Sequence, residues 1–204
     1  MIVIIDAEFG NIRSVGNMLL ACGHQFEIAT SPAQAINATK FILPGVGAFD
    51  HGMQQLHKGG WSDFLHEAVI DKKTPILGIC LGMQLMCTQS EEGQLPGLGW
   101  VDASVQRFRF MKDSQHKVPH MGWNRVSVVR PNPLISETDS QRFYFVHSYF
   151  IACSEEEVVI GKTEYGNSFV SSFQKNNIYG VQFHPEKSHR FGMALMKNFA
   201  EHAK

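Results

Sequence analysis

The first half of the chain alternates short apolar runs with stretches whose apolar residues recur at helical spacing. The unbroken aliphatic run from Ile2 to Ile5 is typical of a strand buried on both faces of a parallel sheet. Gly10 and Asn11 open a helical stretch that continues to Leu20, with Asn11 at the N-cap position. Strands separated by amphipathic helices predict a parallel sheet with helices on both faces. We expect its strands at residues 2–5, 26–29, 41–43 and 75–79.

After residue 95 the pattern changes, because strand-like segments follow one another without helices between them. Turn sequences such as Tyr165-Gly166-Asn167 separate these segments. A final amphipathic helix is expected over residues 189–202. We therefore predict one domain, residues 1–204, in which an antiparallel region extends a mostly parallel α/β sheet. The strands of this region are expected at residues 100–110, 125–129, 143–152, 158–163, 168–174 and 178–183.

Composition narrows the class of protein. Hydrophobic residues make up 44% and charged residues 18% of the chain, as in an ordinary globular protein. The net charge of −1 gives no general attraction to nucleic acid or to an anionic membrane, so we expect neither as a partner. The apolar runs are about five residues long, against the roughly 20 needed to span a bilayer, and the N-terminus does not resemble a signal peptide. Four cysteines without C-x-x-C or disulfide spacing indicate a reducing, cytoplasmic location.

The most informative segment is Gly78-Ile79-Cys80-Leu81-Gly82, which joins a buried strand to a helix. Glycines two residues either side of a nucleophile allow a strained strand-to-helix turn that exposes its side chain. The positive end of the helix dipole would favour the thiolate of Cys80. The backbone N–H of Leu81 would point at the oxyanion formed when Cys80 attacks a carbonyl. The other interpretation is a small buried cysteine between close-packed glycines.

A cysteine nucleophile needs a base that is steadied by a third group. His184 lies just past an apolar strand, and in an extended chain Glu186 projects the same way, with Pro185 restricting the backbone between them. Glu186 could accept a proton from one ring nitrogen of His184 and leave the other facing Cys80. Loops at the carboxyl ends of parallel strands are where open α/β sheets bind ligands, so both segments would meet there.

Most of the other histidines have simpler explanations. Their positions suggest a solvated surface; these are His24, His51, His57, His66 and His202. His184 and His189 lack a third ligand at a helpful spacing, so we expect no metal site.

With these residues the chain resembles the triad-type (class I) glutamine amidotransferases, and more narrowly the glutaminase subunits of bacterial imidazole glycerol phosphate synthases. The elbow around Cys80 marks only the superfamily, whereas residues 117–124 and 144–149 mark the subfamily. The resemblance implies a flavodoxin-like fold and glutamine hydrolysis without a cofactor. The segments that carry it span nearly the whole chain: residues 10–15 (GNIRSV), 43–49 (LPGVGAF), 78–84 (GICLGMQ), 90–93 (SEEG), 117–124 (KVPHMGWN), 144–149 (YFVHSY) and 182–188 (QFHPEKS).

The resemblance also implies roles for individual residues. It makes Cys80, His184 and Glu186 a catalytic triad, and it adds the backbone amide of Val46 to that of Leu81 in an oxyanion hole, after a peptide flip when a partner is engaged. The other interpretation of residues 44–47 is an ordinary tight turn. The positions that match contacts to the substrate L-glutamine are Gly45, Gly47, Gln84, Glu92, Ser148 and Tyr149.

A partner is implied as well. Trp123, Tyr144 and Lys187 match the face that this family presents to a (β/α)8-barrel synthase subunit in a heterodimer, and aromatic residues and long cations are common interface anchors. The other interpretation places both aromatic residues in the core of the antiparallel region. In the family the released ammonia passes to the synthase, which makes imidazole glycerol phosphate and AICAR in histidine biosynthesis.

Two segments depart from the family pattern. The chain has Ala7-Glu8-Phe9 where the family has Tyr-Gly-Met, and residues 189–192 read HRFG, a version that we associate with paralogues serving nucleotide-sugar amidation in surface-polysaccharide pathways. The acceptor of the ammonia therefore stays open between these two pathways. Two further alternatives are a cysteine peptidase-like hydrolase and a non-catalytic regulatory subunit. The intact triad argues against the regulatory subunit.

Overall fold

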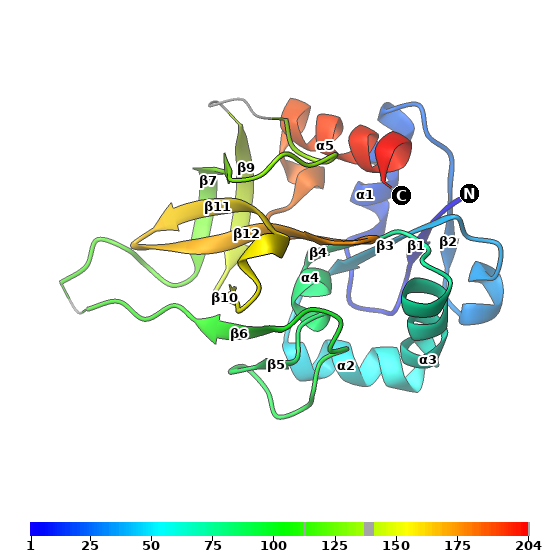
Figure 1. Ribbon diagram of the computed structural model, residues 1–204, viewed down its shortest axis with the longest axis horizontal. Coiled ribbons are helices and arrows are strands. Elements are labelled where there is room, and N and C mark those ends of the chain that lie inside the picture. Colours follow the sequence, from blue (N-terminus) through cyan, green and yellow to red (C-terminus); the bar gives the residue numbers. More distant parts are fainter. Residues whose placement is uncertain (112, 137–140, 204) are drawn as a thin grey trace.

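The aliphatic runs of the first half form the parallel part of a large central sheet (Figure 1). The computed structural model describes residues 1–111, 113–136 and 141–203. The strands lie in the order β2-β1-β3-β4-β13, and each neighbouring pair is parallel. The four strands predicted for this half are all present, as β1 (Ile2–Ile5), β2 (Phe26–Ala29), β3 (Lys40–Gly45) and β4 (Ile76–Cys80).

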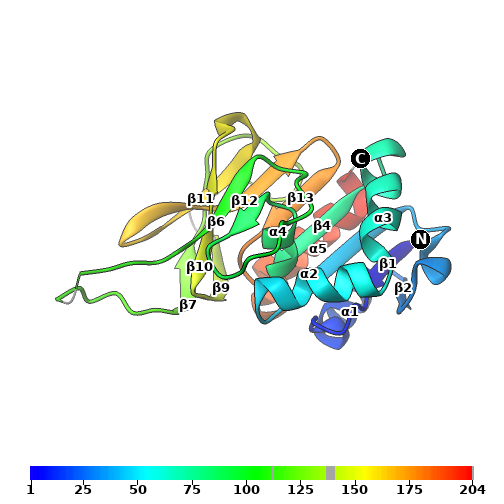
Figure 2. The ribbon, with the colours of Figure 1, turned by 90° about the horizontal axis from the view of Figure 1, so that it is seen from below.

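Helices cover both faces of this sheet, which confirms the predicted α/β class (Figures 1 and 2). Alternate residues of β1 enter different cores: Val3 and Ile5 pack on one side, Ile2 and Ile4 on the other. This is why an unbroken aliphatic run is needed there. Within the described residues, none of the helices is long and apolar enough to cross a membrane. One face carries α1 (Ile12–Ala21) and α5 (His189–His202); the other carries α2 (Phe49–Lys58), α3 (Trp61–Leu65) with a π-helical continuation (His66–Asp71), and α4 (Leu81–Leu85).

The second half extends the sheet mainly with antiparallel pairs, as predicted, and the short β5 at the edge pairs with β6 in parallel. From β13 the order continues β12-β10-β6-β5. β11 pairs with residues 167–173 of β12 and, on its other side, with the short β8. These strands are β5 (Gln89–Ser90), β6 (Ala103–Arg107), β8 (Ser127–Val128), β10 (Tyr149–Cys153), β11 (Val159–Tyr165), β12 (Asn167–Lys175) and β13 (Ile178–Val181). Short 3₁₀ turns complete the elements: η1 (Pro32–Ala35), η3 (Glu156–Val158) and η4 (Pro185–Lys187).

The prediction of one strand over residues 143–152 is wrong. The segment breaks at Ser148 into β9 (Arg142–His147) and β10, which join different sheets. β9 pairs with β7 (His120–Arg125) in a separate two-stranded sheet, and the sequence pattern had given no strand at β7. The apolar alternation continues across the break and contains neither glycine nor proline, so nothing local marks the change of pairing partner.

Candidate active site

The strand-to-helix turn predicted around Cys80 is present. β4 ends at Cys80 and α4 begins at Leu81, and Cys80 has φ 54° and ψ −109°. A positive φ in a residue other than glycine costs about 1–3 kcal/mol and persists only where the surroundings enforce it. Here close packing does so: a Cβ on Gly78 would lie 2.7 Å from the backbone nitrogen of Met83, and one on Gly82 would collide with the carbonyl oxygen of Leu43.

His184 and Glu186 form a buried pair beyond the end of β13. Nδ1 of His184 lies 2.8 Å from Oε1 of Glu186, and both side chains are 2% exposed. The backbone fixes the ring as well, because the His184 N–H donates to the Tyr144 carbonyl at 2.9 Å. Burial alone would lower the pKa of His184, but its interactions with Cys80 and Glu186 raise the pKa to about 9. His184 is therefore a cation at neutral pH.

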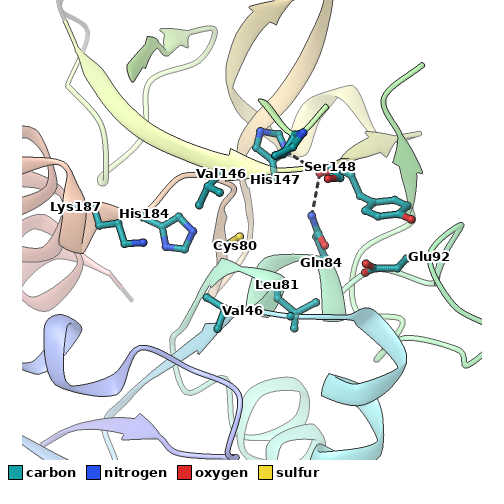
Figure 3. Close-up of a pocket in the computed structure, with 13 residues that line it drawn as sticks. Val46, Cys80, Leu81, Gln84, Glu92, Val146, His147, Ser148, His184 and Lys187 are labelled. Atoms are coloured by element: carbon teal, nitrogen blue, oxygen red, sulfur yellow. Dashed lines mark hydrogen bonds between the residues drawn. The ribbon is translucent and has the colours of Figure 1, made fainter. Parts of the chain in front are cut away.

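The second ring nitrogen of His184 is left for Cys80. Nε2 is buried and has no hydrogen-bond partner within the described part of the chain. Figure 3 shows the His184 ring and the Cys80 sulfur side by side at the edge of the same cavity. The structure thus brings together a thiol, an imidazole and a carboxylate from two neighbouring parallel strands, in the order needed for a nucleophile, a base and an orienting group.

A cavity of about 350 Å³ opens beside this group, which suits a small polar metabolite. No cluster of three or more His, Cys, Asp or Glu side chains among the described residues is placed to hold a metal ion. Most of the residues expected from the sequence to contact substrate line the cavity. Its walls are Val46, Gly47, Cys80, Leu81, Gln84, Glu92, Pro119, Val146, His147, Ser148, Tyr149, His184 and Lys187.

Two residues expected at the cavity behave differently. Gly45 is not in its wall, because it packs beneath the elbow, where an added Cβ would lie 2.6 Å from the backbone nitrogen of Gly82. Val46 lines the cavity, but its backbone N–H donates to the Phe9 carbonyl at 2.7 Å. That amide is therefore not directed at the cavity, and the acceptor that occupies it lies in the Ala7-Glu8-Phe9 segment.

The far wall of the cavity carries polar groups that are held by hydrogen bonds to the backbone. The carboxylate of Glu92 accepts a hydrogen bond from the Phe49 N–H at the start of α2, at 2.9 Å. Gln84, which is 5% exposed, donates through Nε2 to the Tyr149 carbonyl at 3.1 Å. Ser148 lies between β9 and β10, where the interruption of the strand places it in the cavity wall.

The sequence analysis did not single out a buried histidine pair in this wall. Nδ1 of His147 lies 2.7 Å from the Tyr149 carbonyl, and Nε2 lies 2.9 Å from Nδ1 of His120. Nε2 of His120 in turn lies 3.2 Å from the amide of Asn124. Burial lowers the pKa of His120 to about 4 and that of His147 to about 3. Both rings are therefore neutral. His147 donates from Nδ1 to the Tyr149 carbonyl, His120 donates from Nδ1 to Nε2 of His147, and the Asn124 amide donates to Nε2 of His120. One feature of the sequence could have pointed to this pair: His120 and His147 lie inside segments 117–124 and 144–149, which carry the family resemblance.

The three residues expected at a partner interface lie together at one side of the cavity. Trp123 is 40% exposed, so it is not a core residue, and its ring meets that of Tyr144 edge-on at 6.2 Å. Nζ of Lys187 lies 5.7 Å over the Tyr144 ring. His189 stacks on Trp123 at 5.4 Å, a contact that the sequence did not indicate. An apolar hollow adjoins them, lined by Trp123, Arg142, His189, Arg190 and Phe191.

Comparison with known proteins identifies the family of this chain. The family model for class-I glutamine amidotransferases matches residues 3–203. The chain is 48% identical to the imidazole glycerol phosphate synthase subunit HisH 2 of Methanococcus maripaludis, with all of both chains covered. It is also 48% identical to the HisH 2 subunit of Pseudomonas aeruginosa, covering 98% of this chain and 99% of that one. The glutaminase domain of Trypanosoma brucei CTPS with bound acivicin shares the fold, with a TM-score of 0.66, 15% identity and 98% and 93% of the two chains covered. The chain belongs to the class-I glutamine amidotransferases.

Proposed function

We propose that this chain is the glutaminase subunit of an imidazole glycerol phosphate synthase. It hydrolyses L-glutamine to glutamate and ammonia, and a synthase subunit uses the ammonia. The observation that carries the proposal is the buried row of Cys80, His184 and Glu186 at a strained elbow beside the cavity. The relatives named HisH support the choice of synthase.

In the proposed reaction the Cys80 thiolate adds to the side-chain carbonyl carbon of glutamine, forming a C–S bond as an electron pair moves to oxygen. When that pair returns, the C–N bond breaks and protonated His184 gives its proton to the leaving nitrogen, which departs as ammonia. A water molecule then adds to the γ-glutamyl thioester while His184 takes its proton. Cleavage of the C–S bond releases glutamate and restores the thiolate and the imidazolium. The raised pKa of His184 supports this role, since the cation is its resting form.

Oxyanion stabilisation would come from the Leu81 amide at once and from the Val46 amide only after a rearrangement. The Val46 N–H is bonded to Phe9, so the peptide between Gly45 and Val46 has to turn over before it can face the cavity. One such donor contributes roughly 3 to 4 kcal/mol to transition-state stabilisation in comparable sites. We therefore expect the isolated chain to be slow and its partner to accelerate it by driving this rearrangement.

The cavity wall suits the charged ends of glutamine. Glu92 would pair with the substrate ammonium, and backbone groups near Gly47, Ser148 and Tyr149 would hold its carboxylate, with Gln84 keeping the Tyr149 segment in place. The synthase partner is expected to be a (β/α)8 barrel that docks over Trp123, Tyr144 and Lys187, so that ammonia reaches it without entering bulk water. The cytoplasmic location stays a prediction.

The decisive experiment replaces Cys80 with alanine and measures glutamate release in the presence of the purified synthase subunit. The rate should fall by about 10⁴-fold or more, because the nucleophile of the triad is lost. Synthesis from added ammonium salts should be unchanged, since the partner is intact. Cys87→Ala is the matched control: Cys87 is also buried, it lies beyond the C-terminal end of α4, and burial raises the pKa of its thiol. Persistent glutamine hydrolysis in Cys80→Ala would refute the proposal.

A second acceptor is favoured by one observation, the HRFG sequence at residues 189–192, which lies beside Trp123 on the expected docking face. It points to a nucleotide-sugar amidotransferase as the partner, with the same glutaminase chemistry. Mixing the chain with each purified synthase and comparing glutamate release decides between them. Hydrolysis of peptides without any partner would instead identify a peptidase.

A further inference from the structure

A buried glutamine lies against the proposed nucleophile. β4 and β13 are parallel, with Ile79 opposite Val181, so the next residues along the two strands, Cys80 and Gln182, are neighbours. The Gln182 side chain is 0% exposed, and its Nε2 lies 3.6 Å from the Cys80 sulfur, a hydrogen-bonding distance for sulfur. The function proposed above assigned no role to Gln182.

The direction of this hydrogen bond follows from the atoms beyond it. The Tyr149 carbonyl can only accept, so the group of Gln84 that faces it at 3.1 Å is the NH₂ group. The same nitrogen lies 2.9 Å from Gln182, and the group there must be the carbonyl Oε1, which accepts. The NH₂ group of Gln182 is left facing the sulfur. The row of bonds therefore ends in a donor aimed at Cys80.

Such a donor favours one state of the sulfur over the other. A thiolate is a charged acceptor, and hydrogen bonds to charged groups are about twice as strong as those between neutral groups. An unbonded amide buried as deeply as Gln182 would be costly, so the bond to sulfur also satisfies the glutamine. We infer that Gln182 is a catalytic residue, donating a hydrogen bond that stabilises the Cys80 thiolate, and that Gln84 is the positioning residue that orients it.

This inference rests on the proposed function and adds a step to it. The Gln182 NH₂ group stabilises the Cys80 thiolate before it attacks glutamine. It stabilises the thiolate a second time during hydrolysis of the γ-glutamyl thioester, when the C–S bond breaks and the sulfur leaves with the electron pair. In the thioester itself the sulfur carries no charge, so the hydrogen bond is weakest there. Loss of the donor should therefore slow turnover while leaving glutamine binding nearly unchanged.

The direct test is the pH dependence of Cys80 alkylation by iodoacetamide. Because the chain has four cysteines, the modified Cys80 peptide is quantified by mass spectrometry. Gln182→Met keeps the size and removes the donor, and the pH of half-maximal alkylation rate should rise by about one unit. Gln182→Glu places a second negative charge beside the sulfur and should raise the pH of half-maximal alkylation rate further. Gln141→Met is the matched control, a buried glutamine that bonds instead to the Ser136 carbonyl.

Turnover supplies the second measurement. With the synthase subunit present, Gln182→Met should lower kcat by about tenfold and change KM by less than about twofold, consistent with a bond made to the reacting sulfur. If the alkylation profile of Gln182→Met coincides with that of Gln141→Met, the inference is wrong. Should Gln182→Met fail to fold by circular dichroism, Gln84→Met takes its place, with a smaller upward shift expected and an unchanged profile as the contrary result. The alkylation assay needs no glutamine, so it gives its answer even if Cys80→Ala were to retain glutaminase activity.

Discussion

The cavity has two walls that are held in place by different forces. The elbow wall, residues 78–84 with the end of β3, is fixed by backbone atoms in direct contact, and its glycines leave no space for a side chain. The ribbon wall consists of β7 and β9, a separate two-stranded sheet, together with Ser148 and Tyr149, which lead into β10 of the main sheet. A row of hydrogen bonds between buried side chains runs from His120 through His147 to the Tyr149 carbonyl and helps to hold this ribbon against the main sheet. The proposed nucleophile belongs to the first wall, and the residues expected to bind substrate backbone and partner belong mainly to the second.

This difference teaches what each wall should tolerate. Contacts between backbone atoms cannot relax, so the elbow wall should be damaged by a single added methyl group. The ribbon wall depends on two neutral histidines, so it should lose stability at acidic pH, where these histidines become protonated. At the outer surface of this wall Trp123 is 40% exposed. A substitution there should affect stability much less than an added methyl group in the elbow wall or acidic pH in the ribbon wall.

The largest effect is expected from Gly82→Ala. The new methyl group would collide with the Leu43 carbonyl oxygen of β3, and neither backbone can move without breaking the sheet. The free energy of unfolding, measured by urea denaturation, should fall by about 4 kcal/mol or more, and glutamine hydrolysis should be lost with the elbow.

Gly52→Ala on α2 is the control for this change. A Cβ there meets only the ends of leucine side chains, at 3.0 Å from Leu85 and 3.3 Å from Leu81, which can shift. Its stability should stay within about 1 kcal/mol of the parent, since alanine also favours the helix. If the two variants lose equal stability, the elbow wall is not specially rigid.

The two walls also differ in how far the sequence predicts them. The elbow could be predicted because its nucleophile and both glycines lie within five residues, and the glycines indicate close packing even though one of the backbone groups they meet, the Leu43 carbonyl, belongs to β3. The pairing of β9 with β7 could not, because an apolar alternation is the same whichever strand lies beside it. The same holds for the bond between the Val46 amide and the Phe9 carbonyl, which joins residues 37 positions apart and involves no side chain.

The second prediction concerns acid and the His120–His147 pair. An ordinary histidine has a pKa of 6.5, and burial lowers these two to about 4 and about 3. Between pH 6.5 and about pH 5 the unfolded chain therefore takes up protons that the folded chain does not, so the stability that the pair supplies at neutral pH is lost as the pH falls. We expect the free energy of unfolding to drop by about 3 kcal/mol over this range, measured by urea denaturation at both ends.

The double variant His120→Gln/His147→Gln should be less stable at pH 7 and should lose much less on acidification. His57→Gln serves as the control, because His57 is exposed on α2 and is not among the residues that line the cavity. It should keep the full acid sensitivity of the parent. An identical acid loss in the double variant would show that the ribbon wall does not depend on neutral histidines.

The smallest effect is expected at the outer surface of the ribbon wall, from Trp123→Ala. Half-exposed aromatic residues at the centre of an interface typically contribute about 2 kcal/mol to binding, so the Kd for the synthase subunit should rise by about 30-fold. The thermal midpoint of the isolated chain should hardly change, because the ring is 40% exposed and lies at the surface, edge-on to Tyr144 and stacked on His189.

Isothermal titration calorimetry of the two subunits measures this change, and Ile36→Ala is its control. Ile36 is an apolar side chain that is 71% exposed and directly follows η1, in the connection between β2 and β3. β2 lies at the opposite end of the molecule from β7 (Figure 1). Its removal should leave the Kd unchanged. Equal affinities for the Trp123→Ala and Ile36→Ala variants would place the docking face elsewhere, and the ribbon wall would then hold substrate without linking it to the partner. If only Trp123→Ala raises the Kd, and glutamate release at saturating synthase subunit is unchanged, Trp123 contributes to docking and not to catalysis.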